Sequence, residues 1–383
     1  MRICMITHDQ IERNKPTADL VRFKCLGETL AKQSIDVAFI TLNDKARYEE
    51  GYYKSSKVYK IPVLSKIKLI QLICFCAFLL PLMFRAKRAG SFDIIFVNSV
   101  LSIPSVLIFR WLLGYGFIQF DLMGILSEER FHGKRKTFWV DTAKKILSSV
   151  EDFLLSRIDF VTTINEKHKQ ILMNRITRPV YVIRDAVHEE VLKHASVPPK
   201  DQPSTPKIVV IFVGQISDCR LDTLFNIMPG LLAEFPNLEL QVLGSGPQTD
   251  RYIDMVESLG LSDKVIFQGH LPHEKIFYYI KIADIAYSDV RSVNGFPMKI
   301  FEYMAMGKPV VAESTEGIKE LLIDHANALL YQNERELKEK VLALAKDGRL
   351  RKEIGENAKE MMYDHTWEKR IESLCSIYRQ HLA

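Results

Sequence analysis

The chain has 383 residues, of which 47% are hydrophobic and 26% are charged, with a formal net charge of +5. This length predicts roughly two domains, and the composition is that of a soluble globular protein. Its six cysteines include no Cys-x-x-Cys pair, which argues against a disulfide framework and against a zinc site. Because the first residues lack the long apolar run of a signal peptide, we expect a cytoplasmic protein.

Charge is shared unevenly along the chain. Residues 1–195 contain 30 lysines and arginines against 20 aspartates and glutamates, whereas residues 196–383 contain 22 against 27. This asymmetry predicts that the N-terminal half meets an anionic partner. Nucleic acid is not the partner we expect, because the basic residues are scattered and form no recognised nucleic-acid module.

Strand-like and helical patterns alternate through the first half. Runs of β-branched and aromatic residues predict strands at residues 2–6, 36–40, 93–98, 117–120, 160–163 and 180–183. Apolar residues at helical spacing predict helices at residues 18–33, 102–112, 141–156 and 166–174.

A proline-rich segment, residues 196–206, interrupts this alternation. Its prolines forbid a regular helix, so we interpret it as a linker between domains, with a long surface loop as the alternative. Beyond it, strands are expected at residues 208–213, 238–243, 265–268, 285–287, 309–312 and 328–331. Helices are expected at residues 221–235, 248–259, 273–280, 297–306, 316–323 and 334–345.

Such alternation predicts an α/β fold, with parallel sheets that carry helices on both faces. Ligands in these folds bind at the carboxyl ends of the strands, so two such domains would face a cleft.

The most informative stretch is residues 294–312, which read Asn-Gly-Phe-Pro-Met-Lys-Ile-Phe-Glu-Tyr-Met-Ala-Met-Gly-Lys-Pro-Val-Val-Ala. A glycine loop leads to Pro297, a residue favoured at the first position of a helix. The loop N–H groups, the helix N-terminus and Lys299 together suit a phosphate. Glu302 can accept hydrogen bonds from sugar hydroxyls. An ordinary helix–turn–strand unit is the alternative interpretation.

Three glycine turns precede this motif, each after an expected strand: Gly214, then Gly244-Ser245-Gly246, then Gly269-His270-Leu271. In this order the segments closely resemble the retaining, nucleotide-sugar-dependent glycosyltransferases of the GT-B fold. The likeness is to the large bacterial group that builds cell-surface polysaccharides and glycolipids. It is specific over about residues 207–345 and looser in the first half.

The resemblance implies two Rossmann-like, doubly wound domains. An acceptor-binding domain would occupy residues 1–195 and a nucleotide-sugar-binding domain residues 207–365, joined by the linker at 196–206. A terminal helix at residues 366–383 would cross back to the first domain.

The resemblance also implies a donor site. Glu302 would bind the ribose hydroxyls, and Arg220 and Lys299 would pair with the diphosphate. Backbone at Gly295, Phe296 and Pro297 would approach the donor sugar and diphosphate. The other implied donor contacts are Gly214, Gly244, Gly246, Gly269, Leu271 and Asn294.

The sequence departs from the family pattern at three places. Asn294 stands where a glutamate is common near the donor sugar, and Gln215 stands at a usually basic position. His8-Asp9-Gln10 replaces the glycine pair usual after the first strand. Lys299 would supply the positive charge that Gln215 lacks.

The implied chemistry is transfer of a hexose-type sugar with retention at the anomeric carbon. Because the departing diphosphate gains negative charge, Arg220, Lys299 and the helix N-terminus would be the catalytic groups. No metal and no cofactor beyond the donor are expected, and the chain contains no Asp-x-Asp sequence. The acceptor would be a glycan or a lipid-linked molecule. A non-catalytic nucleotide-sugar-binding subunit, motivated by Asn294 and Gln215, and a nucleotide-sugar epimerase are the alternatives.

Asp121 is the candidate for an acceptor-side catalytic group, because it follows the expected strand at 117–120. A structural aspartate that caps a helix or turn is the alternative. His8 is a second candidate, and Glu128, Glu129 and His132 form a polar loop that reads mainly as solvated surface.

Residues 69–84 are almost wholly apolar and have basic residues on both sides. This stretch is too short to span a bilayer. A buried core helix and an interfacial helix are the two interpretations, and we favour the latter because of the basic first half. The basic clusters at 134–136 and 144–145 would add to the same surface. We therefore expect peripheral contact with an anionic membrane.

Overall fold

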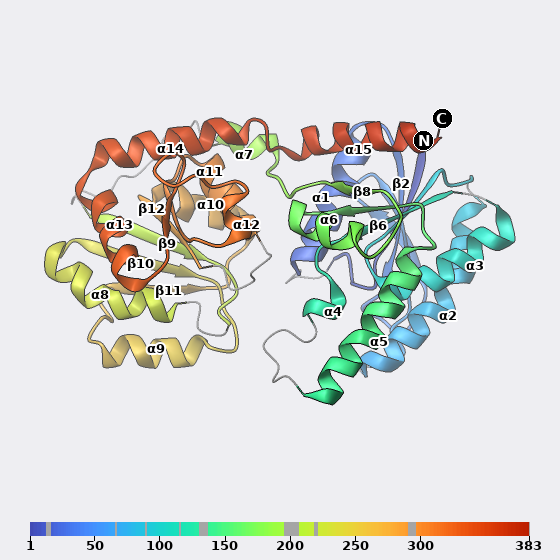
Figure 1. Cartoon of the computed structure of the whole chain (residues 1–383), viewed down its shortest axis with the longest axis horizontal. Helices are drawn as coiled ribbons and strands as arrows, with labels where there is room; N and C mark the ends of the chain where they lie inside the picture. The colour runs from blue at the N-terminus through green and yellow to red at the C-terminus, as the bar shows by residue number, and fades with distance from the viewer. Residues whose placement is uncertain are drawn as a thin grey trace. The chain divides into compact units, whose positions relative to one another are not determined.

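The computed structural model describes residues 1–12, 17–65, 67–88, 90–114, 116–129, 137–194, 207–217, 221–289 and 296–382. The chain divides into two compact units, coloured by residue number in Figure 1. Unit 1 comprises Met1–Asp185 and Trp367–Ala383, and unit 2 comprises Ala186–Thr366.

The described residues of unit 1 form an eight-stranded sheet in the order β3-β4-β2-β1-β5-β6-β7-β8. Its strands are β1 (Arg2–Ile6), β2 (Asp36–Leu42), β3 (Glu49–Tyr53), β4 (Ser56–Ile61), β5 (Ile94–Val97), β6 (Phe117–Leu122), β7 (Phe160–Thr163) and β8 (Val180–Val182). All neighbours pair in parallel except β3 and β4, which form an antiparallel hairpin at one edge. The sequence prediction missed this hairpin because charged residues break its apolar pattern.

Helices cover both faces of this sheet. They are α1 (Ala18–Lys32), α2 (Lys68–Lys87), η1 (Val100–Ser102), α3 (Ile103–Leu113), α4 (Leu126–Glu129), α5 (Phe138–Leu155), α6 (Glu166–Met173) and α15 (Trp367–Leu382). Several begin at side-chain caps: Thr17, Thr137 and Asn165 each accept a hydrogen bond from an N–H in the first turn. The Thr137 cap explains why α5 starts before the predicted residue 141.

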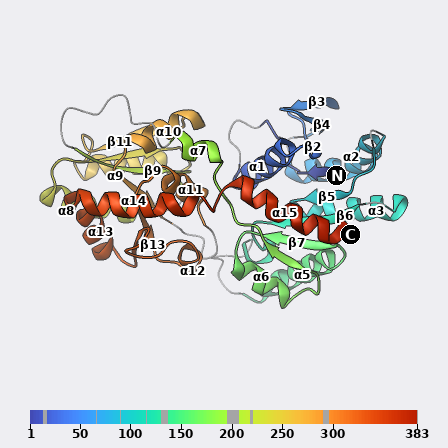
Figure 2. The same ribbon diagram turned by 90° about the horizontal axis from the view of Figure 1, so that it is seen from above.

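Helix α15 packs against α1 in unit 1, as Figure 2 shows from above. Its Trp367 and Tyr378 are buried, and the Tyr378 hydroxyl donates to Gln119 Oε1 at 2.6 Å. Helix α2 buries Phe75, Leu79 and Met83 in the core of unit 1. Within the described part of the chain, no helix is both long enough and apolar enough to cross a membrane.

The described residues of unit 2 form a six-stranded, fully parallel sheet in the order β11-β10-β9-β12-β13-β14. Its strands are β9 (Ile208–Val213), β10 (Leu238–Leu243), β11 (Val265–Gly269), β12 (Ile285–Ser288), β13 (Val310–Glu313) and β14 (Leu329–Tyr331). Its helices are α7 (Glu189–His194), α8 (Asp222–Glu234), α9 (Thr249–Ser258), α10 (His273–Ile282), α11 (Met298–Ala305), α12 (Glu316–Lys319), α13 (Glu334–Lys346) and α14 (Gly348–Met362). A separate apolar cluster fills each face of the sheet.

Unit 2 begins before the predicted linker. Val187 pairs with Thr366 in a parallel bridge, and α7 contacts α11, so the residues after Asp185 belong to unit 2. The predicted linker at 196–206 lies outside the described residues.

Candidate functional site

The strand order of unit 2 marks one position for a ligand. On one side of β9 lies β10, which follows it in sequence, and on the other side lies β12. Chain order therefore reverses between β9 and β12, and open α/β sheets bind ligands at the carboxyl ends of the strands at such a reversal. Gly214 follows β9, and α11 follows β12, so the predicted donor elements flank this position.

The glycine turns after β9 and β10 are packed against each other. Gly214 N donates to Leu243 O at 3.0 Å, and Gly244 N donates to Gly269 O at 2.8 Å. A Cβ atom on Gly244 would lie 1.8 Å from Gly214 O. A Cβ atom on Gly246 would likewise lie 1.9 Å from Ile216 O. These two glycines are therefore required by contact between neighbouring loops, a reason that the sequence did not reveal.

Helix α11 places Lys299 and Glu302 together in its first turns. The Lys299 ammonium donates to both carboxylate oxygens of Glu302, at 3.0 and 2.8 Å. Pro297 is the N-cap residue rather than the first helical residue as predicted. Because its side chain cannot accept a hydrogen bond, the helix N-terminus keeps its positive character.

Tyr303 fixes α11 to the end of β9, a role that was not predicted. Its buried hydroxyl accepts a hydrogen bond from Val213 N at 2.8 Å, one residue before Gly214. Burial raises the pKa of Tyr303, so the phenol stays protonated. In the sequence, the position of Tyr303 directly after Glu302 was the feature that could have marked it as part of the site.

The remaining predicted donor residues divide into two groups. Phe296 and Leu271 pack as partly buried side chains against the apolar cluster shared with α11, and Phe296 lies 4.9 Å from the ring of Phe301. Three predicted residues lie outside the described part of the chain, and their placement stays a prediction: Arg220, Asn294 and Gly295. Asp289, buried at the end of β12, was not singled out from the sequence.

The structure gives Asp121 a different setting from the one expected. It lies within β6 rather than after the strand, and it is buried. Its two oxygens accept hydrogen bonds from Arg22 Nε and Nη2 at 2.7 and 2.9 Å, and one oxygen also accepts from Thr162 Oγ1 at 2.7 Å. Arg22, which is fully buried, also donates to Asp185 Oδ1 at 2.9 Å. This arrangement is a buried ion-pair cluster, which accounts for Asp121 structurally.

Other acceptor-side candidates are surface residues or lie outside the described part. His8 is exposed in the loop after β1, and Glu128 pairs with Lys144 at 2.8 Å. The side chain of Glu129 and all of His132 lie outside the described residues.

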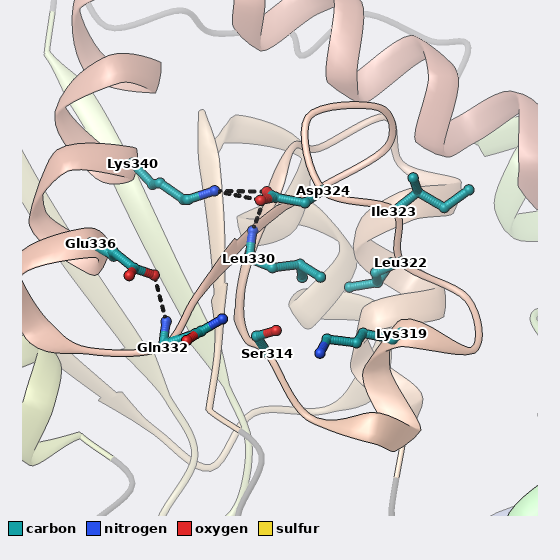
Figure 3. Close-up of a pocket in the computed structure, with 9 residues that line it drawn as sticks. All are labelled: Ser314, Lys319, Leu322, Ile323, Asp324, Leu330, Gln332, Glu336 and Lys340. Atoms are coloured by element: carbon teal, nitrogen blue, oxygen red, sulfur yellow. Dashed lines mark hydrogen bonds and ion pairs between the residues drawn. The ribbon is translucent and has the colours of Figure 1, made fainter.

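A cavity of about 580 Å³ lies at the carboxyl ends of β13 and β14. Figure 3 shows Lys340 and Asp324 pointing toward each other at its wall, where Lys340 Nζ donates to both carboxylate oxygens at 2.7 and 2.8 Å. The predicted donor residues do not line this cavity.

Comparisons with known proteins bear on these units. Residues 196–361 match the family described as glycosyl transferases group 1. An uncharacterized glycosyltransferase of Methanocaldococcus jannaschii is 24% identical over 361 residues, 92% of this chain and 93% of the relative. The D-inositol 3-phosphate glycosyltransferase of Corynebacterium diphtheriae is 26% identical over 180 residues, 44% of this chain and 42% of that enzyme.

Solved structures show the same fold. Sucrose-phosphate synthase from Thermosynechococcus elongatus aligns with a TM-score of 0.77 at 18% identity, over 99% of this chain and 98% of its own. Anabaena HepE in complex with UDP-glucose aligns with a TM-score of 0.74 at 17% identity, over 99% and 100%.

The two parallel-sheet units and these structural relatives show that the chain has the GT-B fold, as the sequence predicted. Residues 196–361 are similar to the glycosyl transferases group 1 family, and the relative from Methanocaldococcus jannaschii is similar to this chain over most of its length.

Proposed function

We propose that the protein transfers a hexose-type sugar from a nucleoside diphosphate sugar to a glycan or lipid-linked acceptor. The observation that carries this proposal is the Lys299–Glu302 pair at the start of α11, beside the point where strand order reverses. A positive group and a carboxylate side by side suit the adjoining diphosphate and ribose of such a donor. The complexes of HepE with UDP and with UDP-glucose support the same class of donor.

The proposed chemistry follows from charge. The departing diphosphate gains negative charge in the transition state, and fixed positive groups stabilise it most effectively. Lys299 and the N–H groups of the first turn of α11 would supply this stabilisation, with Arg220 as a further cation. Glu302 would accept hydrogen bonds from the ribose hydroxyls. On this proposal no divalent metal is needed, and the anomeric configuration is retained.

Thermal shift with UDP-, GDP- and ADP-sugars tests donor binding. We expect one nucleotide class to raise the melting temperature of the parent protein and to have little effect on Glu302→Ala. A matched control is Glu356→Ala, which breaks an exposed Lys–Glu pair on α14 and should respond like the parent. If Glu302→Ala is stabilised by the nucleotide sugar as strongly as the parent, the donor site is wrongly placed.

Transfer itself is tested with the donor found in that screen and a mixture of lipid-linked and free glycan acceptors. EDTA should leave the rate unchanged, whereas strict dependence on Mn²⁺ would contradict metal-independent transfer. Nuclear magnetic resonance of the product would show whether the anomeric configuration is retained.

A non-catalytic nucleotide-sugar-binding subunit is the second candidate. Gln215, exposed in the loop after β9, carries no positive charge at a position that is usually basic in the family. This candidate predicts that the parent protein binds the nucleotide sugar but neither hydrolyses nor transfers it. Turnover that appears in Gln215→Arg but not in the parent would then show that the parent lacks a positive charge needed for catalysis.

A further inference from the structure

Helix α3 presents an apolar face to solvent. Pro104, Ile108, Trp111 and Leu112 are exposed and follow the i, i+4, i+7, i+8 spacing of one helical stripe. Trp111 has 83% of its surface exposed. The single charged residue of the helix, Arg110, instead donates to Asp159 Oδ2 at 2.6 Å. A helix on the surface of a soluble protein normally turns polar residues outward.

Helix α5 also turns apolar side chains toward solvent. Its outward stripe consists of Trp139, Ala143, Ile146, Val150 and Phe153, at successive spacings of four, three, four and three residues. Trp139 is 78% exposed and Phe153 is 59% exposed.

The inward side of α5 carries a charged residue instead. Glu151 is buried and accepts hydrogen bonds from Ser127 Oγ and Arg175 Nη2, each at 2.9 Å. Helix α5 therefore buries a carboxylate and exposes aromatic side chains.

The two stripes belong to one layer of unit 1. Helix α3 joins β5 to β6, the segment with α5 joins β6 to β7, and both helices contribute to the same apolar core. Helix α5 also contacts η1, which leads into α3. Figure 1 places α3 and α5 on unit 1 away from α15. We call the exposed stripes of α3 and α5 the α3–α5 face.

Basic side chains border this face. Arg88 follows α2. Helix α2 packs against α3, where the ring centroids of Phe84 and Phe109 are 5.4 Å apart. Arg157 follows α5, and its guanidinium lies 4.9 Å from the ring of Phe153. Arg178 Nε donates to Ser156 O at the end of α5. These three arginines are exposed, as is Lys145 on the flank of α5.

We propose that the α3–α5 face docks on the surface of an anionic lipid bilayer. Tryptophan and phenylalanine favour the boundary between headgroups and acyl chains, where an amphipathic ring gains apolar contact. The arginines and lysine at the border would contact lipid phosphates, which fits the basic balance of residues 1–195. Helix α2, the interfacial helix expected from the sequence, contributes less because Phe75 and Leu79 fill the core. The proposal concerns lipid binding alone and does not require sugar transfer.

Tryptophan fluorescence tests the geometry directly. The chain has three tryptophans, of which Trp111 and Trp139 lie on this face and Trp367 is buried. Vesicles of phosphatidylcholine with roughly 30% phosphatidylglycerol should shift the emission to shorter wavelength, and brominated lipid should quench it. In the double variant Trp111→Phe/Trp139→Phe neither change should occur, although the protein still floats with the vesicles.

Flotation with the same vesicles tests the interaction itself. We expect the double variant Trp139→Glu/Val150→Glu to bind at least tenfold more weakly than the parent, with an unchanged melting temperature. The control Tyr52→Glu, at a 72% exposed aromatic residue on β3, should bind like the parent. Equal binding by the charged variant and the parent would overturn the proposal. A lipid-free dimer of the parent that Trp139→Glu dissociates would also overturn it, because the face would then bind a second copy.

Discussion

Replacing Gly244 by alanine tests whether the donor loops depend on close backbone contact. A Cβ atom at this position would lie 1.8 Å from Gly214 O, whereas ordinary contact begins at 3.4 Å. The loops after β9 and β10 would have to separate by roughly 1.6 Å, which disturbs the hydrogen bond from Gly214 N to Leu243 O. Gly244 also has a φ of +138°, which an alanine rarely adopts.

Both the positive φ and the added Cβ atom would destabilise this variant. Backbone strain of this kind costs about 1–3 kcal/mol, and overpacking a filled site costs a further 1–3 kcal/mol or so. We therefore expect Gly244→Ala to lower the free energy of unfolding by about 4 kcal/mol. Gly269 is a matched control at the end of the neighbouring strand, with a φ of +67°. Among the described residues a Cβ there would meet no atom within 4 Å, so its cost is only about 1–2 kcal/mol.

Urea unfolding followed by circular dichroism measures the difference between the two variants. With a slope of about 2 kcal/mol per molar urea, the midpoint for Gly244→Ala should lie roughly 1 M below that for Gly269→Ala. Gly244→Ala should also lose the stabilisation by nucleotide sugar, because the Gly214 loop moves. If Gly244→Ala is no less stable than Gly269→Ala, the close packing of the two loops is refuted.

Three further predictions concern buried or partly buried polar groups. Arg22→Met should lower the free energy of unfolding by about 3–5 kcal/mol in urea titration, because two buried carboxylates lose their partner; a loss below 1 kcal/mol would contradict the buried cluster. Tyr303→Phe should cost about 1–3 kcal/mol in the same assay, because the buried Val213 N–H loses its acceptor, and an unchanged midpoint would argue against this bond. Burial lowers the pKa of Lys308 to about 8 from 10.5, so its ammonium is disfavoured in the folded protein. The free energy of unfolding should therefore rise between about pH 8 and 10.5, by at most roughly 3 kcal/mol, relative to that of Lys308→Met. Parallel pH profiles for the two proteins would refute this assignment.

Local sequence patterns determined most of the architecture. The spacing of apolar residues located β1, β7, β9 and β10 to the residue, because strand and helix periods differ. Glycine and proline chemistry located the turns and the start of α11. The order of these turns then indicated the GT-B fold. The β3–β4 hairpin was missed because its charged residues conceal the alternation.

The candidate donor site was predictable where its residues are close in sequence. Lys299 and Glu302 are three residues apart, and their contact follows from the helical period. The hydrogen bond between Val213 and Tyr303 spans 90 residues and depends on how α11 docks on the sheet. No local pattern encodes such a pairing.

What the sequence by itself determined is which residues share a strand, a turn or a helix face. Only the tertiary structure decided what each face meets. Asp121 was expected at an open strand end, yet packing places it against Arg22, 99 positions away. The apolar spacing predicted a helix over residues 141–156, but it did not show that Trp139 and Phe153 face solvent while Glu151 is buried. The physical reason is that periodicity shows which side chains lie together, whereas burial depends on the partner that covers them.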